Sequence, residues 1–218
     1  MVYILNIETS TKNCSVALAK DGETLVSREI AEMGYSHAEK LHVFIEEILT
    51  EANIQFSELD AIAVSQGPGS YTGLRIGVSA AKGLCYALNI PLIAVDTLEI
   101  LASQISIEKG LIVPMIDARR MEVYAAIFDK NHQKIREIKA EILTVDSFSA
   151  WNETIYFVGD SSQKAKIILQ KENFIFVENV IYPSAKQMTK KSYTFFTNNR
   201  FEDIAYFEPF YLKDFMIS

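Results

Sequence analysis

The beginning of the chain alternates apolar and polar residues in short segments, which is the pattern of half-buried β-strands. Three such segments lie at 3–7, 14–19 and 24–30. Asp21 and Gly22, between the second and the third, form a residue pair that tight hairpin turns favour. We therefore predict that the chain opens as an antiparallel meander of three strands.

From residue 36 the apolar residues recur with a helical period. Ser36 and Glu39 form a capping box, which marks the start of a helix. The apolar stripe of this helix consists of Leu41, Phe44, Ile45, Ile48 and Leu49. The pattern then predicts, in order, a strand at 61–65, a helix at 71–88, a strand at 92–95 and a helix at 97–105.

The second half of the chain repeats this order. An apolar strand at 111–116 ends in Asp117, just as the first strand is followed by Glu8. These two acids lie 109 residues apart, which is half of the 218 residues. An alternating strand at 122–128 and a turn at 129–132 follow, at the same offset from the first hairpin. An internal duplication is the simplest account of this repeat.

The duplication predicts a two-lobed α/β protein with mixed sheets, the lobes being residues 1–105 and 106–218. The remaining elements predicted for the second half are strands at 154–158 and 174–178 and helices at 161–170 and 184–197.

The composition, 49% hydrophobic and 22% charged, is that of an ordinary globular protein. No apolar run reaches the roughly 18 residues that cross a bilayer, and no basic leader opens the sequence, so we expect a cytoplasmic protein without membrane association. A net charge of -7 opposes nucleic-acid binding, so tRNA is expected to be contacted only indirectly, through a partner. Cys14 and Cys85 lack CxxC partners and are expected to be buried as small apolar residues.

Polar residues follow the first strand where the chain turns back. In Glu8-Thr9-Ser10, backbone amides and hydroxyl groups could hold a phosphate group. The alternative is a polar β-turn satisfied by its own Thr and Ser side chains. The residue pattern leaves both open.

The segment 67–77 connects a predicted strand to a predicted helix, where a phosphate-binding loop would also lie. It is not a Walker loop, because no Gly-Lys-Ser/Thr follows. Glycine in a helix interior costs roughly 1 kcal/mol relative to Ala, so Gly73, Gly77 and Gly83 need an offsetting interaction. Close helix packing, within the chain or against a partner, is one explanation, and anion binding is the other.

A metal site or a complete nucleotide site is not predicted. His37 and His42 are five residues apart, so their side chains lie about 140° apart on a helix and do not form an i, i+4 ligand pair. A second glycine-rich loop is missing, because Asp117-Ala118-Arg119-Arg120-Met121 stands in its place. We expect no catalytic residue, no metal and no cofactor bound by the chain alone. Contacts to ATP, ADP or phosphate are expected only at an interface shared with a partner, from Glu8, Thr9, Ser10, Gly69, Ser70 and Arg75.

The order of elements resembles the actin-like, ribonuclease H-like fold shared by actin, hexokinase and the 70-kilodalton chaperones. Five segments are similar to the TsaB (YeaZ) family of bacterial tRNA threonylcarbamoyladenosine biosynthesis. They are Leu5-Asn6-Ile7-Glu8-Thr9-Ser10, Ser36-His37-Ala38-Glu39, residues 67–77, Asp117-Ala118-Arg119-Arg120-Met121-Glu122-Val123-Tyr124 and Glu208-Pro209-Phe210-Tyr211-Leu212. They span nearly the whole chain, but Glu8 stands where many relatives have Asp, and residues 148–207 diverge.

The resemblance implies a non-catalytic subunit that pairs with a metal-bearing catalytic sister, TsaD, and works with the ATPase TsaE. The sister modifies the adenosine next to the anticodon in tRNAs that read codons beginning with A. A stand-alone small-molecule kinase of the actin-like fold is the alternative. A peptidase is not expected, because neither a nucleophile with its base nor a zinc motif is present.

We expect the helices at 36–52 and 71–88 to lie side by side and to present one apolar, small-residue surface. This surface would form a homodimer in isolation and a heterodimer with the sister. Its predicted residues are His37, Leu41, Phe44, Ile45, Ile48, Gly73, Ile76, Gly77, Ala80 and Leu84.

Overall fold

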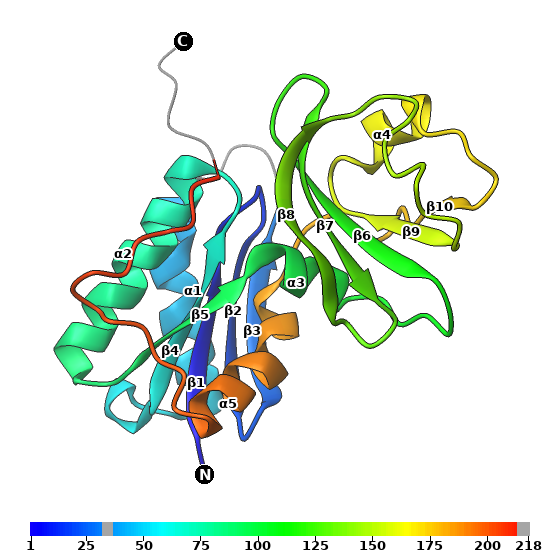
Figure 1. Ribbon diagram of the computed structural model, residues 1–218. Coiled ribbons are helices and arrows are strands. Elements are labelled where there is room, and N and C mark those ends of the chain that lie inside the picture. Colours follow the sequence, from blue (N-terminus) through cyan, green and yellow to red (C-terminus); the bar gives the residue numbers. More distant parts are fainter. Residues whose placement is uncertain (32–36, 213–218) are drawn as a thin grey trace. The chain divides into compact units, whose positions relative to one another are not determined.

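The computed structural model describes residues 1–31 and 37–212, which fold into two compact units. The first unit comprises residues 1–97 and 183–211, and the second comprises residues 98–182 together with residue 212. In Figure 1 the colours follow the chain, and the orange and red segments near its end lie with the blue and cyan elements of the first unit.

The first unit is built on a five-stranded mixed sheet with the order β3-β2-β1-β4-β5. The strands are β1 (Tyr3–Glu8), β2 (Cys14–Lys20), β3 (Glu23–Ile30), β4 (Ala61–Gly67) and β5 (Leu92–Asp96). β1, β2 and β3 form the predicted antiparallel meander, and β4 and β5 run parallel to β1. The hairpin turn is confirmed, since Asp21 and Gly22 have φ angles of 50° and 84°, the left-handed conformation that such turns require.

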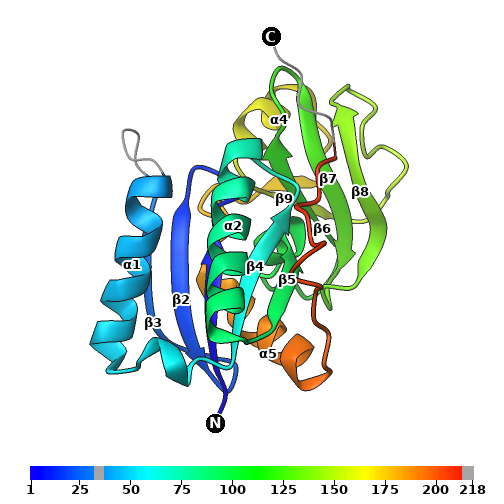
Figure 2. The same ribbon diagram turned by 90° about the vertical axis from the view of Figure 1, so that its left-hand side faces the viewer.

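Helices cover both faces of this sheet, as Figures 1 and 2 show. On one face α1 (His37–Ala52) packs against β2 and β3, and α2 (Tyr71–Leu88) packs against β1, β4 and β5. On the other face lie the 3-10 turn η2 (Ala185–Met188) and α5 (Thr189–Thr197). A short 3-10 turn, η1 (Phe56–Glu58), connects α1 to β4. The predicted capping residue Ser36 lies outside the described residues.

The second unit has a five-stranded sheet with the order β10-β9-β6-β7-β8. Its strands are β6 (Leu111–Asp117), β7 (Glu122–Asp129), β8 (Lys134–Ile142), β9 (Ile155–Val158) and β10 (Phe174–Phe176). Its helices are α3 (Thr97–Ala102), which begins at the last residue of the first unit's opening segment, and α4 (Ser162–Ile168). Three antiparallel strands are again followed by two parallel ones, so the strand order of the first unit is repeated. This repetition confirms the two mixed sheets and the internal duplication.

Residues 183–211 do not follow the predicted division of the chain at residue 105. They belong to the first unit, because a buried polar network ties the start of this segment to β2 and β3. Asn13 Nδ2 donates to the Pro183 carbonyl oxygen at 3.0 Å, and the Ala185 amide donates to Ser15 Oγ at 3.0 Å. The single helix predicted at 184–197 is also divided, into η2 and α5.

The helices within residues 1–31 and 37–212 include none that is both long and apolar enough to cross a membrane.

Candidate functional site at the turn after β1

The turn that follows β1, residues 9–11, is buried and is bonded to both helices on its side of the sheet. We call it the β1 turn. Thr9 Oγ1 donates to the Gly73 carbonyl oxygen at 2.8 Å, and the Ser70 amide donates to the Ser10 carbonyl oxygen at 2.6 Å. His37 Nε2 lies 2.7 Å from the Thr11 carbonyl oxygen, to which it must donate. The β1 turn therefore joins the first turn of α2 to the first residue of α1.

Three glycines of the segment 67–77 allow this close approach. A Cβ atom at Gly69 would overlap with the Ser10 carbonyl oxygen, one at Gly73 with the Thr9 carbonyl oxygen, and one at Gly77 with Thr9 Oγ1. The expected close packing is thus confirmed for Gly73 and Gly77, and it occurs within the chain. Gly83 is different, because a Cβ atom there would meet nothing within 4 Å.

Glu8, the last residue of β1, is completely buried beside this turn. Its Oε1 accepts a hydrogen bond of 2.6 Å from the Ser10 amide. Burial raises the pKa of Glu8 from 4.5 to about 7, and the Ser10 hydroxyl, the Ser10 amide and the Ser65 hydroxyl offset only part of this effect.

The residues predicted to contact a phosphate group fall into two places. Glu8, Thr9, Ser10, Gly69 and Ser70 lie together, but the first three are completely buried by the packing of α2. A ligand could touch their side chains only if the first turn of α2 moved away. That these five residues contact a nucleotide stays a prediction.

Arg75, the sixth predicted phosphate contact, lies apart from the β1 turn on the exposed side of α2. Its guanidinium carbon lies 4.1 Å from the centre of the Tyr71 ring, and its Nε donates to Tyr211 Oη at 3.1 Å. The rings of Tyr71 and Tyr211 are themselves 5.0 Å apart. Arg75 therefore fastens the end of the described chain to α2.

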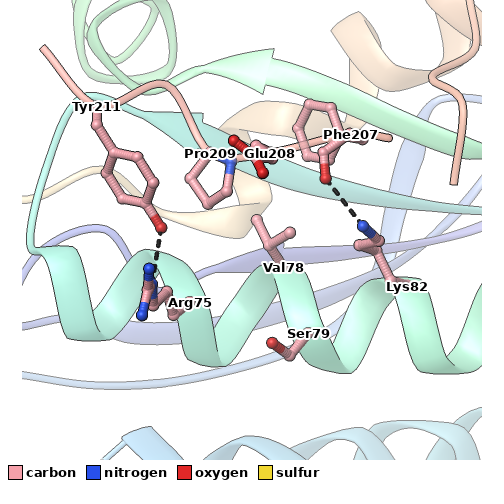
Figure 3. A pocket seen from close by; sticks show the side chains of 8 residues that line it. All are labelled: Arg75, Val78, Ser79, Lys82, Phe207, Glu208, Pro209 and Tyr211. Atoms are coloured by element: carbon pink, nitrogen blue, oxygen red, sulfur yellow. Dashed lines mark hydrogen bonds between the residues drawn. The ribbon is translucent and has the colours of Figure 1, made fainter. Parts of the chain in front are cut away.

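Figure 3 shows a pocket of about 340 Å³ between α2 and this closing segment. Lys82 Nζ donates to the Phe207 carbonyl oxygen at 2.9 Å on the opposite side of the pocket from Arg75. Sequence reasoning missed this pocket, although Tyr71 and Arg75 at i, i+4 were a usable signal. Arg75 Nε donates to Tyr211, and Lys82 Nζ donates to the main chain of Phe207. These two side chains of the pocket therefore hold residues 207–211, the closing segment, against α2.

The predicted partner surface on α1 and α2 is corrected in part. Leu41, Ile45 and Ile48 are at most 1% exposed and belong to the core between α1 and the sheet. Gly73 and Gly77 are buried against the β1 turn. These five residues are not on the surface, because the apolar stripe of α1 and the glycines of α2 are used to build the first unit itself.

The other five predicted residues, His37, Phe44, Ile76, Ala80 and Leu84, are half-buried. Ile76, Ala80, Gly83 and Ala87 follow one another at helical spacing along α2. Gly83 and Ala87, which share the small-residue face expected to pack closely within the chain or against a partner, are exposed, and the nearby Tyr86, which was not predicted, is 83% exposed. The surface available on α2 is therefore shifted toward its C-terminal half.

The loop after β6 takes the place that the β1 turn has in the first unit, and it is built differently. Arg119 and Arg120 are exposed and have φ angles of 70° and 51°. Lys164 Nζ binds the Asp117 carboxylate and donates to the Arg120 carbonyl oxygen at 3.0 Å. The bulky loop without glycine is thus fixed in place. Within residues 1–31 and 37–212, no group of three His, Cys, Asp or Glu side chains could hold a metal ion.

The chain is similar to known proteins over nearly its whole length. The family model described as "TsaD: tRNA N6-adenosine threonylcarbamoyltransferase" matches residues 29–214. The tRNA threonylcarbamoyladenosine biosynthesis protein TsaB of Haemophilus influenzae is 32% identical over 88% of this chain and 77% of its own length. TsaB of Escherichia coli is 27% identical over 97% of this chain and 94% of its own length. The solved structure of YeaZ from Pseudomonas aeruginosa covers 97% of this chain and 100% of its own, with 27% identity and a TM-score of 0.83.

Two units with the same mixed-sheet order define an α/β protein of the actin-like fold. The glycine-rich segment after β4 is used for packing against the β1 turn. With the whole-length similarity to TsaB and YeaZ, and with the matching family model, the chain belongs to the TsaB (YeaZ) family.

Proposed function

We propose that this protein is a non-catalytic dimerisation subunit of the tRNA N6-threonylcarbamoyladenosine transferase complex. In this role it pairs with a TsaD-type catalytic subunit and works with a TsaE-type ATPase to modify the adenosine next to the anticodon. The observation that carries the proposal is the similarity to TsaB over nearly the whole chain, together with the match of residues 29–214 to the TsaD family model.

The packing around the two loops supports a non-catalytic role. α2 packs directly against Thr9 and Ser10 and leaves no space for a ligand there. The loop after β6 carries the bulky residues Arg119 and Arg120 at the place where the main chain would have to approach a phosphate group closely. We propose that ATP or ADP is bound only at an interface with the partner. The purified chain should then hydrolyse no ATP.

We propose that the stripe of α2 formed by Ile76, Ala80, Gly83 and Ala87 is the surface that binds the catalytic subunit. Small side chains at Ala80, Gly83 and Ala87 let another helix approach closely, and Tyr86 beside them offers a large ring of the kind that is enriched at interfaces. The same stripe would form a homodimer in isolation, so the two assemblies should compete.

The test uses Gly83→Arg, because this position is exposed and a Cβ atom there meets nothing within 4 Å, so the substitution should leave the fold intact. We expect this variant to elute as a monomer in size-exclusion chromatography and to lose co-purification with the TsaD-type subunit. The matched control is Thr194→Arg, at an exposed position of α5 on the other face of the sheet. Normal association of Gly83→Arg would contradict the proposed surface.

The function itself is tested by assaying threonylcarbamoyladenosine with the TsaD-type and TsaE-type proteins, with and without this chain. Equal product in both reactions would contradict the proposed role.

A further inference from the structure

The β1 turn connects one buried carboxyl group to the starts of two helices. Glu8 Oε1 accepts from the Ser10 amide at 2.6 Å, and the Ser10 carbonyl oxygen accepts from the Ser70 amide at 2.6 Å. Through Thr9 the turn reaches Gly73, and through Thr11 it reaches the first residue of α1. These contacts are short, and most of the atoms in them are buried. A displacement of the Glu8 carboxyl group therefore cannot be absorbed locally.

The second oxygen of the carboxyl group is not satisfied. Among the residues that the structure describes, Glu8 Oε2, Ser10 Oγ and Ser65 Oγ are buried without a hydrogen-bond partner. The two hydroxyl groups lie near enough to favour the ionised carboxyl, but none of these three atoms is in hydrogen-bonding geometry. Buried polar atoms almost always have a partner. A proton on Oε2 would supply a donor at this place, whereas its loss would leave a buried negative charge.

The charged and titratable groups around Glu8 do not compensate for that charge. Cys14, at the start of β2, is the ionisable group that interacts with it, and burial together with the Glu8 carboxylate raises the pKa of this thiol to about 11. On β3 and η2, Glu29 and Lys186 pair with each other at 3.0 Å. In the part of the chain that the structure describes, the groups that act on the pKa of Glu8 are Ser10 and Ser65, and no cation is among them.

We propose that Glu8 holds a proton in the folded protein near neutral pH, and that loss of this proton is transmitted through the β1 turn to the starts of α1 and α2. The pKa of about 7 that burial imposes agrees with this assignment. If the proposed function holds, α2 also carries the partner surface, and association with the catalytic subunit should weaken as the pH rises from 6 to 8.

The experiment follows the purified chain by nuclear magnetic resonance between pH 5.5 and 8.5. We expect the Glu8 carboxyl carbon to titrate with a midpoint near 7, and the amide signals of Ser10, Ser70 and Gly73 to shift with the same midpoint. In Glu8→Gln these amide shifts should disappear. Amides of β7 in the second unit serve as the reference that should not respond.

Three results would overturn the proposal. A Glu8 carboxyl carbon signal that is already at its ionised position at pH 5.5 and does not titrate up to pH 8.5 would show that the group is ionised at neutral pH. Amide shifts that persist in Glu8→Gln would assign them to a group other than Glu8. A Ser10 shift without any Ser70 or Gly73 shift would show that the signal stops at the turn. None of these readings needs a partner, so they do not depend on the proposed function.

Discussion

Gly73 lies in the first turn of α2 with its Cα directed at the main chain of the β1 turn. The substitution Gly73→Ala adds a single methyl group, which would overlap with the Thr9 carbonyl oxygen. This oxygen belongs to a completely buried residue whose own hydroxyl is bonded to the Gly73 carbonyl. The oxygen cannot rotate away as the end of a flexible side chain would, so α2 or the turn must shift.

Two opposing effects determine how much Gly73→Ala changes the free energy of unfolding. Replacing glycine by alanine in a helix interior is favourable by roughly 1 kcal/mol. Forcing an extra methyl group into a well-packed interior typically costs about 1–3 kcal/mol, and here the obstacle is backbone, so the upper end applies. We expect Gly73→Ala to lower the free energy of unfolding by about 2 kcal/mol.

The measurement is urea unfolding followed by far-ultraviolet circular dichroism. Gly83→Ala is the matched control, because it makes the same chemical change in the same helix where a Cβ atom meets nothing within 4 Å. It should raise the free energy of unfolding by up to about 1 kcal/mol. A Gly73→Ala variant as stable as Gly83→Ala would refute the assignment of this glycine to close packing.

Three further predictions concern stability. Because the pKa of Glu8 is raised from 4.5 to about 7, the free energy of unfolding of the wild type should fall as the pH rises across this window. Urea unfolding at pH 8 should therefore show Glu8→Gln to be more stable than the wild type by up to about 3 kcal/mol. This difference should disappear below pH 4.5, where Glu8 is protonated in both the folded and the unfolded protein. Burial would raise the pKa of Glu29, but hydrogen bonds from Ser184 and Lys186 outweigh it, so this carboxylate stabilises above about pH 4.5 and less as pH falls. Glu29→Gln should therefore lower the free energy of unfolding by about 1 kcal/mol at pH 7, and should not change it once Glu29 is protonated. Urea unfolding at a series of pH values measures this difference, and a difference that does not depend on pH would contradict the prediction. Removal of residues 200–212 should lower the melting temperature measured by circular dichroism. The reason is that Ile204 and Phe207 pack against the core of the first unit, and the Glu202 amide donates to the Leu92 carbonyl oxygen. An unchanged melting temperature would show that this segment does not stabilise the first unit.

Much of the fold was predictable because local patterns and tertiary packing agree. The bounds of α2 were predicted as the structure has them, and β1 to β7 were found within two residues or fewer, since their periodicity is strong and turns bound them. Strand β8 was not predicted, and α3 ends at Ala102 instead of 105. The destination of residues 183–211 could not be predicted, because it depends on hydrogen bonds between residues about 170 positions apart.

The candidate site was predictable in its composition but not in its geometry. The glycines of α2 indicated close packing, yet only the structure shows that their partner is Thr9 in the same chain. For the same reason Leu41, Ile45 and Ile48 were assigned to a partner surface: an apolar stripe at helical spacing looks the same whether it covers a sheet or a second protein. The burial of Glu8 also depends on strands and helices that are distant in sequence.

The first unit is assembled from both ends of the chain, and this has a consequence for its synthesis. Its sheet is complete once residue 97 has been made, but η2, α5 and the segment that Arg75 and Lys82 fasten come from residues 183–211. On the ribosome, where domains generally fold as they emerge, the second unit is finished while one face of the first sheet is still uncovered. The nascent protein must therefore keep an unfinished first unit from aggregating until residues 183–211 have been made.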